Sequence, residues 1–355
     1  MILNIIYGFI GLSLLILVHE LGHFLVARWA NVKVLSFSLG FGKKLLSHKK
    51  GDTEYAISAI PLGGYVKMLG EVPGEEIPEE DMSRSYSSKS PLTKILIVFA
   101  GPFFNLLFAL VLFYFVFLSG YSVLSTKVGS LEKNYPAYNA GIMEGDTIVS
   151  IDEKNISEWS DLMDAMAQTG VHPIKVKIKR NGNYLDVTLT PKEIESKNIF
   201  GDTIRRKVIG VAAANEFFTK KETVTGAAVK AVNQTYNLTK VTILGIVKLI
   251  EGSISPKQVG GPLLILEIAG KQAKEGKKNL IYFIAIISIN LGVINLLPIP
   301  ILDGGHILFH TIELVTRRRL SLKFIEISQK VGMGILVAIM ALAFFNDITR
   351  MFFGK

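Results

Sequence analysis

The sequence predicts an α-helical polytopic membrane protein with four transmembrane helices and an inserted α+β domain. The chain has 355 residues, of which 49% are hydrophobic and only 19% are charged. Soluble proteins devote about a quarter of their residues to charge, so this chain falls short. The deficit is concentrated in long uncharged stretches, and a region of alternating apolar and charged residues lies between two of them. That alternation is typical of strands in a water-exposed domain.

Composition excludes several classes of protein. The chain has no cysteine, which excludes a disulfide framework, a thiolate metal site and a cysteine nucleophile. Lys and Arg number 39 against 30 Asp and Glu, for a net charge of +9. The basic residues flank apolar stretches instead of forming a stripe with stacking aromatics, so we do not expect nucleic-acid binding. We expect them to contact anionic lipid of the bilayer.

The first element, residues 1–30, is a helix that is uncharged from Ile2 to Val18 and continues through ionisable residues to Trp29. It lacks the basic beginning and the small-residue cleavage site of a signal peptide, so we expect it to be retained as a membrane span. Its length suits the ~20 residues that a helix needs to cross the hydrocarbon core.

The motif His19-Glu20-Leu21-Gly22-His23 lies at the end of this span. Residues four apart share a helix face, so His19 and His23 can ligate one metal ion. Glu20 is placed to take a proton from an activated water without ligating the metal. Three ionisable side chains at membrane depth are costly and usually mark function. The sequence therefore predicts a zinc site here, the alternative being a coincidental pair of buried histidines.

The next elements set the orientation. Residues 31–94 form a lysine-rich loop, and the second span, residues 95–120, is uncharged throughout. The loop 303–330 is also basic, with three consecutive arginines. By the positive-inside rule both loops are cytoplasmic, which puts the region between the second and third spans outside.

The outer region divides into two parts. In residues 121–215, Ile174, Val176 and Ile178 alternate with lysines before the turn residues Asn181-Gly182, which predicts a β-hairpin. Ser160 is expected to cap a short helix, and Leu162, Met163 and Met166 are expected to pack inward. Residues 216–279 predict amphipathic helices on the outer membrane surface, or else a solvated helix packed on the insert.

The third span, residues 280–302, ends in a segment that Pro298 and Pro300 interrupt. Such a break is tolerated where protein or a wet cavity surrounds it. Two histidines leave a catalytic zinc one protein ligand short, and Asp303 follows the break at the depth of His19 and His23. We favour Asp303 as the third ligand over His306. The fourth span, residues 331–346, is shorter than the ~20 residues expected.

These motifs resemble those of bacterial site-2 proteases of the RseP type, which are zinc intramembrane metalloproteases. The resemblance rests on the HExxH run, on Asn295 to Gly304, which reads N-x-x-P-x-P-x-L-D-G, and on Phe99 to Asn105 in the second span. In the outer region, residues 140–151 and 208–211 resemble parts of a PDZ domain; the alternative is a β-rich domain without a ligand. The family carries two PDZ domains in its best-known members, whereas this chain has room for one.

The resemblance implies one Zn²⁺ per chain, held by His19, His23 and Asp303, with Glu20 as the catalytic base. It also implies a membrane-associated β-hairpin at about residues 53–69 that pairs with the substrate. The substrate-binding residues it implies are Asn295, Asn290, Gly63 and Gly64. The implied substrates are single-span membrane proteins, such as trimmed anti-sigma factors or remnant signal peptides, cleaved in regulated intramembrane proteolysis at the bacterial cytoplasmic (inner) membrane.

Two alternatives come from other functional classes. One is a non-enzymatic PDZ adaptor with a purely structural metal, which predicts a closed site of four protein ligands. The other is a metal-ion transporter, which requires a continuous polar path that the fourth span does not offer. The sequence leaves the oligomeric state and the physiological substrate open.

Overall fold

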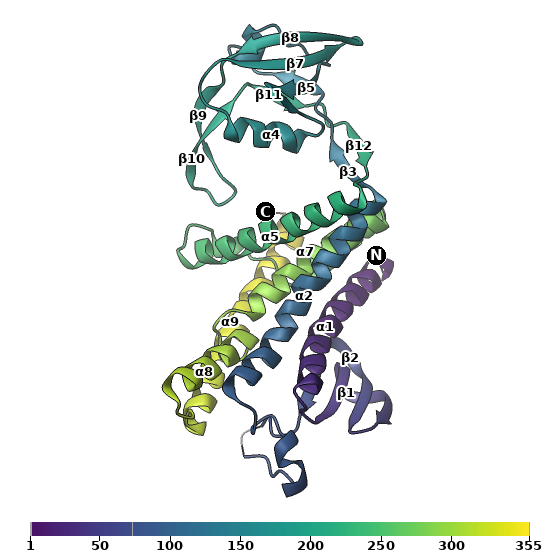
Figure 1. Cartoon of the computed structure of the whole chain (residues 1–355), viewed down its shortest axis with the longest axis vertical. Coiled ribbons are helices and arrows are strands. Elements are labelled where there is room, and N and C mark those ends of the chain that lie inside the picture. The colour runs from purple at the N-terminus through teal and green to yellow at the C-terminus, as the bar shows by residue number, and fades with distance from the viewer. Residues whose placement is uncertain (1, 73, 355) are drawn as a thin grey trace. The chain divides into compact units, whose positions relative to one another are not determined.

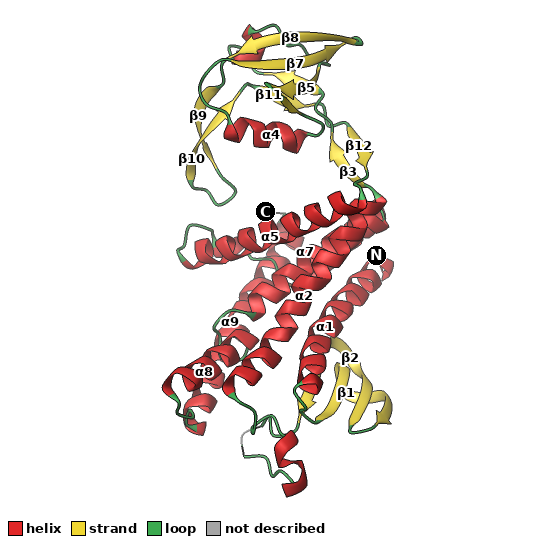
Figure 2. Ribbon diagram, viewed as in Figure 1, coloured by secondary structure: helices red, strands yellow, loops and turns green. Residues whose placement is uncertain are grey.

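The computed structural model describes residues 2–72 and 74–354 and divides into two compact units (Figure 1). One unit, the helical unit, comprises the chain up to Val116 and from Thr225 onward; the other, the insert, is Phe117–Val224. Figure 2 shows that helices dominate the first unit and strands the second.

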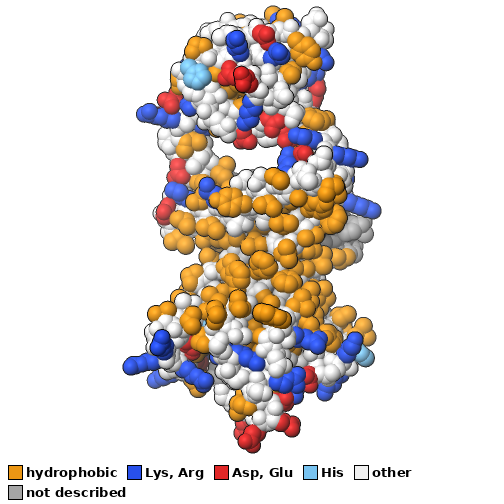
Figure 3. All heavy atoms as spheres, viewed as in Figure 1, with side chains coloured by type: hydrophobic (Ala, Val, Ile, Leu, Met, Phe, Trp, Pro, Cys, Tyr) orange, Lys and Arg blue, Asp and Glu red, His pale blue; other side chains and the backbone are white. Residues whose placement is uncertain are grey.

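The helical unit contains long apolar helices. Within the described residues, four helices are long and apolar enough to cross a membrane, as predicted, and Figure 3 shows hydrophobic side chains gathered over this unit. These four are α1 (Ile2–Trp29), α2 (Pro91–Ser119), α7 (Lys277–Asn295) and α9 (Leu322–Phe353). The other helices are α5 (Val224–Ile250), α6 (Pro262–Glu275), α8 (Asp303–Thr316) and two 3₁₀ turns, Glu79–Arg84 and Pro256–Gln258.

Two predicted spans differ from the helices observed. The third was expected to run to residue 302, but α7 ends at Asn295 and α8 begins at Asp303. The two prolines between them, at 298 and 300, provide no N–H for a helix. The fourth was predicted to be shorter than a full span, but α9 continues beyond residues 331–346 at both ends. Its N-terminus is capped by Ser321, whose hydroxyl accepts the N–H of Phe324.

Helix α9 carries a buried carboxylate, that of Asp347. The residue is 2% exposed and accepts backbone N–H groups at the start of α6. Gly261 donates to Oδ1 at 2.8 Å, while Leu263 and Leu264 donate to Oδ2 at 3.0 and 3.1 Å. Three orphan donors of a helix N-terminus are thus satisfied by one anion, and the helix dipole favours its charge.

The two helices of residues 216–279 belong to the helical unit, not to the insert. On α5, Gln234 donates to the hydroxyl of Tyr282 and Thr242 to Oδ1 of Asn290, both partners lying on α7. Helix α6 packs closely on α1, since a Cβ at Gly8 would fall 2.6 Å from the Leu266 side chain. Both helices therefore contact other helices of their own unit, and their position on the outer membrane surface stays a prediction.

A two-stranded sheet follows α1. Strand β1 (Val34–Lys50) and strand β2 (Thr53–Met68) both bend, so that each contributes two segments. Residues 34–39 lie in the centre, paired on one side with residues 54–57 and on the other with residues 64–68. The structure therefore differs from the hairpin predicted at 53–69: its two arms flank β1 instead of pairing with each other. Among the described residues, 64–68 form an edge.

The insert is built around a four-stranded antiparallel sheet in the order β6-β5-β7-β8, with three further two-stranded pairings, β11-β4, β10-β9 and β12-β3. Its helices are α3 (Pro136–Asn139) and α4 (Trp159–Gln168). Its strands are β3 (Tyr121–Leu124), β4 (Val128–Leu131), β5 (Thr147–Ile151), β6 (Lys154–Asn155), β7 (Ile174–Arg180), β8 (Asn183–Leu189), β9 (Lys192–Lys197), β10 (Thr203–Val208), β11 (Val211–Ala213) and β12 (Phe217–Lys220).

Local sequence signals in the insert are largely confirmed. Asn181 and Gly182 both have positive φ, 48° and 89°, and connect β7 to β8, as the type I′ turn requires. Leu162 and Met166 of α4 join the core, but Met163 is 40% exposed, so its predicted inward packing is wrong. The cap of α4 is Glu158, in a reciprocal pair with Asp161, and not Ser160.

Candidate metal centre and active site

The imidazoles of His19 and His23 lie one above the other on α1, as the i, i+4 spacing requires. Both residues are buried, and their Nε2 atoms are 3.2 Å apart. The Nδ1 atoms point to partners on α2. His23 Nδ1 lies 2.9 Å from the carbonyl oxygen of Ile97, and His19 Nδ1 lies 3.1 Å from the side-chain amide of Asn105. Both rings therefore present Nε2 to the same place.

Asp303 reaches this place from the first residue of α8. Its Oδ2 is 3.0 Å from Nε2 of His19, and its Oδ1 is 3.6 Å from Nε2 of His23. Among the described residues these three side chains form a group whose ligand atoms all lie within 4.8 Å of one another. His306 is outside that group and lines the adjoining cavity.

The donor set fits a zinc ion. Ligand atoms held about 2.0–2.1 Å from a tetrahedral zinc lie roughly 3.3 Å from each other, close to the separations seen here. Asp303 Oδ2 is buried and accepts no hydrogen bond from the described residues, although an imidazole nitrogen is 3.0 Å away. In the tautomer that carries its proton on Nδ1, His19 Nε2 and Asp303 Oδ2 face each other as two lone pairs, an arrangement that calls for a cation between them. Three protein ligands leave a coordination position open, as in catalytic zinc sites.

Glycine keeps space beside the imidazoles. A Cβ at Gly101 on α2 would lie 2.3 Å from Nε2 of His23 and 2.8 Å from Nε2 of His19. On α1, next to His23, a Cβ at Gly22 would lie 2.4 Å from the carbonyl oxygen of Ala100. Helices α1 and α2 therefore approach closely at the metal group because both contact positions lack a side chain. The sequence analysis did not single out Gly101, although it lies within the motif of the second span.

A cavity of about 430 Å³ adjoins the metal group. It is lined by His19, Glu20, His23 and Asp303, and by the edge segment of β2 through Tyr65, Val66 and Met68. Gly64 lies directly against the catalytic candidate, since a Cβ there would be 3.3 Å from Cγ of Glu20. The cavity thus brings Glu20, the metal group and an unpaired strand edge together.

Sequence reasoning missed a hydrogen-bonded chain on the wall of this cavity. The hydroxyl of Tyr86 is 2.9 Å from Nε2 of His310, whose Nδ1 is 3.1 Å from Glu313. Burial raises the pKa of Tyr86 and lowers the pKa of His310, although Glu313 opposes the latter shift. Tyr86 precedes α2 and the other two residues lie on α8, so no local pattern indicates their contact.

The remaining predicted site residues are spread around the group. Gly63 begins the edge segment and is buried under Phe41, whose ring would be 1.9 Å from a Cβ there. Asn295 is half-buried at the last residue of α7. Asn290, also on α7, accepts the hydroxyl of Thr242 from α5 at 2.8 Å.

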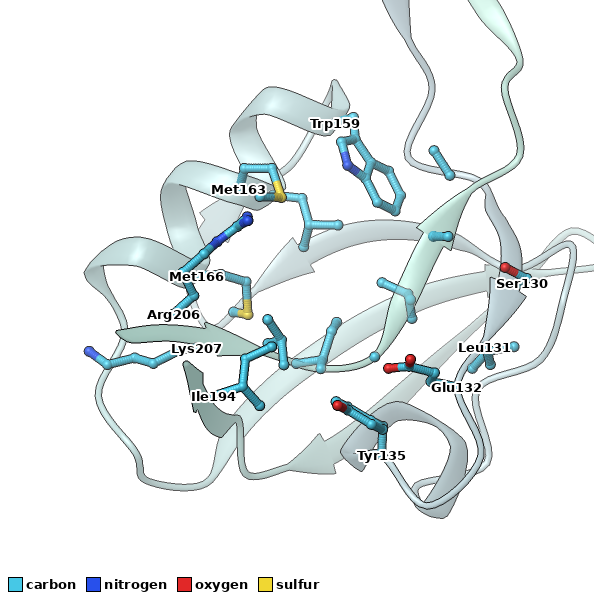
Figure 4. A pocket seen from close by; sticks show the side chains of 17 residues that line it. Ser130, Leu131, Glu132, Tyr135, Trp159, Met163, Met166, Ile194, Arg206 and Lys207 are labelled. Atoms are coloured by element: carbon cyan, nitrogen blue, oxygen red, sulfur yellow. The ribbon is translucent and has the colours of Figure 1, made fainter. Parts of the chain in front are cut away.

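The insert has its own groove of about 570 Å³ beside α4. Trp159, Met163 and Met166 project toward it from α4, and Arg206 and Lys207 lie at one end (Figure 4). Residues 208–211, which resemble part of a PDZ domain, also line it, but they do not form one strand: Val208 ends β10, Val211 begins β11, and residues 209 and 210 connect the two. The exposure of Met163 is explained by this groove.

Apolar helices that bring an HExxH pair together with a half-buried aspartate and a half-buried glutamate are typical of a membrane metalloprotease. The chain belongs to Peptidase family M50, whose family model matches residues 7–339. The protein is accordingly a zinc metalloprotease with zinc as its cofactor.

Three relatives agree with this assignment, each bearing the name "Putative zinc metalloprotease". The one from Campylobacter jejuni is 40% identical over 342 residues, which cover 96% of this chain and 91% of the relative. The one from Helicobacter pylori strain J99 is 39% identical over 350 residues, covering 96% and 97%. The one from Clostridium acetobutylicum is 36% identical over 345 residues, covering 97% of each.

Proposed function

We propose that the protein is an intramembrane endopeptidase of the site-2 type, which cleaves the transmembrane segments of single-span substrates. The observation that carries the proposal is the meeting of His19, His23 and Asp303 on two elements of an apolar helical unit, with Glu20 in the same cavity. Ionisable groups are rare at such depth and are retained where they serve function.

In this proposal His19, His23 and Asp303 hold the zinc ion. Zinc, when bound, supplies a Lewis acid that activates water and polarises the scissile carbonyl. Glu20 takes the proton of the attacking water and later delivers it to the leaving amine. The burial of the group excludes bulk water, which strengthens every electrostatic interaction inside the site.

The substrate must be unwound before cleavage, because a helix hides its carbonyls in its own hydrogen bonds. We infer that the freed segment adds as a strand to the edge at residues 64–68. Gly64 allows this segment to pass close to Glu20, and Gly63 allows the edge to begin under Phe41. Asn295 is proposed to bind freed backbone. The same role is proposed for Asn290, whose Nδ2 can donate to freed backbone while its Oδ1 accepts the Thr242 hydroxyl.

The insert is proposed to be a single PDZ-type domain that recognises an extended peptide in the groove beside α4. Its apolar lining and the cationic Arg206 and Lys207 suit an extended chain with an apolar side chain and an anionic end. We further propose that the insert is extracytoplasmic and that the enzyme is a multi-pass protein of the bacterial cytoplasmic membrane. Trimmed anti-sigma factors and remnant signal peptides, handled in regulated intramembrane proteolysis, are the proposed substrates.

The test is cleavage of a model single-span substrate by purified full-length protein carrying Glu20→Gln. We expect turnover to fall by about 10²- to 10⁴-fold, because a general base is lost, while bound zinc stays at the wild-type level. Glu326→Gln is the matched control, since Glu326 is exposed and its partner among the described residues is Lys330, one turn along α9. Normal turnover by the Glu20 variant would refute the proposed mechanism and favour a non-enzymatic adaptor.

A further inference from the structure

We propose that Asn105 is a positioning residue of the zinc site: its carboxamide oxygen accepts the Nδ1 proton of His19 and thereby fixes the tautomer that presents Nε2 to the metal. The inference rests on the assignment of His19 as a zinc ligand, made above. It concerns a residue of α2 that is neither a ligand nor a catalytic group.

The two nitrogens of the His19 ring have different neighbours. Its Nε2 lies on the side of His23 and Asp303, at 3.2 and 3.0 Å, whereas its Nδ1 lies 3.1 Å from the Asn105 amide. A neutral imidazole carries one proton, so a free lone pair at Nε2 requires the proton to be on Nδ1. A ring that binds metal through one nitrogen therefore needs a hydrogen-bond acceptor at the other.

His23 shows the same arrangement with an unambiguous partner. Its Nδ1 faces the carbonyl oxygen of Ile97 at 2.9 Å, and a carbonyl can only accept. Ile97 and Asn105 both lie on α2, two turns apart, so one helix orients both imidazoles of the neighbouring helix. For His23 the backbone provides the acceptor, and for His19 a side chain must provide it.

The amide of Asn105 has an acceptor available. Asn105 is fully buried, and its Oδ1 has no hydrogen-bond partner among the described residues, while its Nδ2 is the atom placed toward His19. The oxygen and nitrogen of an amide are distinguished by their hydrogen bonds, and a half-turn of the amide exchanges them. With Nδ1 protonated, the required orientation places Oδ1 against His19.

The backbone around Asn105 is held independently of His19. Ser288 on α7 donates its hydroxyl to the Asn105 carbonyl oxygen at 2.7 Å. On the same side, Gly292 brings α7 close, since a Cβ there would lie 3.3 Å from the Cβ of Asn105. The backbone that carries the Asn105 amide is thus held by α7 through contacts that do not involve His19.

The experiment measures the zinc dissociation constant of purified full-length protein by chelator competition. Asn105→Leu keeps the branched shape of the side chain but removes the acceptor, and we expect zinc to bind 10- to 100-fold more weakly. Asn105→Asp keeps an acceptor, and we expect binding at least as tight as in wild type. Ser288→Ala is the matched control: it removes a bond to the same residue from the side away from His19 and should leave the constant unchanged.

Three results would overturn the inference: zinc binding by Asn105→Leu within threefold of wild type, an equal loss in Asn105→Asp, or an equal loss in Ser288→Ala. If Asn105→Leu does not fold, Asn105→Asp alone tests the inference: zinc binding tenfold weaker in that variant would contradict the acceptor role. Asp303→Ala is measured alongside. Unchanged zinc binding in Asp303→Ala would refute the ligand assignment and, with it, this inference. If Asp303→Ala loses zinc binding but Asn105→Leu does not, only the inference about Asn105 is refuted.

Discussion

Gly101→Ala is the smallest change that tests whether the space beside the imidazoles is used. The added Cβ would fall 2.3 Å from Nε2 and 2.5 Å from Cε1 of His23, and 2.8 Å from Nε2 of His19. Both nitrogens are the atoms proposed to hold zinc. Neither ring is the far end of a flexible side chain, because the Nδ1 atoms are held by Ile97 and Asn105.

The size of the effect follows from these distances. The His23 ring must retreat by about 1.1 Å, the difference between 2.3 Å and an ordinary contact of 3.4 Å. That movement breaks the bond to the Ile97 carbonyl, which contributes about 1 kcal/mol. A misplacement of about 1 Å near the chemistry costs roughly 10²-fold in rate. We therefore expect turnover to fall about 100-fold, together with weaker zinc binding.

The assay pairs zinc analysis of the purified protein with cleavage of a model single-span substrate. Gly334→Ala is the matched control, because Gly334 lies inside α9 and a Cβ there meets nothing within 4 Å. It should leave activity unchanged and stabilise the helix by up to about 1 kcal/mol. Zinc content and turnover of Gly101→Ala both within twofold of wild type would refute the reasoning.

Three further predictions concern stability and substrate access. Asp347→Ala leaves three backbone donors of α6 without their anion, so the free energy of unfolding in detergent should fall by about 3–5 kcal/mol. Burial of Asp146 acts to raise its pKa, but hydrogen bonds from Arg180 and from the Met143 N–H outweigh burial and hold the pKa below its ordinary value. The Asp146–Arg180 ion pair therefore stabilises the insert above about pH 4, and this stabilisation is lost as the pH falls further. Hydrogen exchange of β7 peptides in full-length protein, at pH 5 and pH 3, measures that loss. Gly64→Ala should reduce cleavage about tenfold with unchanged zinc binding, because its Cβ would crowd the Ser38 carbonyl at 2.8 Å and Glu20 at 3.3 Å.

Each of these predictions has an outcome that contradicts it. An unfolding midpoint of Asp347→Ala equal to wild type would mean that the α6 donors find other partners. Asp146→Asn should lose the acid dependence, so an unaltered pH profile in that variant would assign the effect to other groups. Zinc loss in Gly64→Ala would show that the edge strand supports the metal group instead of the substrate.

Features that depend on a few neighbouring residues could be predicted without the tertiary structure. The turn at Asn181-Gly182 needs only two consecutive residues that tolerate positive φ, and Asn followed by Gly is recognisable in the sequence. The shared face of His19 and His23 follows from 3.6 residues per turn of one helix. By contrast, the sequence could not predict the order of segments in the sheet, where residues 34–39 lie between residues 54–57 and 64–68. Period-2 alternation does not specify which segment pairs with which.

The sequence by itself determined the four spans, the HExxH pair and the carboxylate most suited to complete it. These are properties of single helices and of composition. Only the tertiary structure decided that Asp303 reaches His19, that Asn105 and Gly101 of α2 surround the imidazoles, and that Asp347 caps α6. The physical reason is that apolar faces in a membrane protein all resemble one another, so helix contacts depend on close packing and isolated polar bonds that leave no periodic pattern in the sequence.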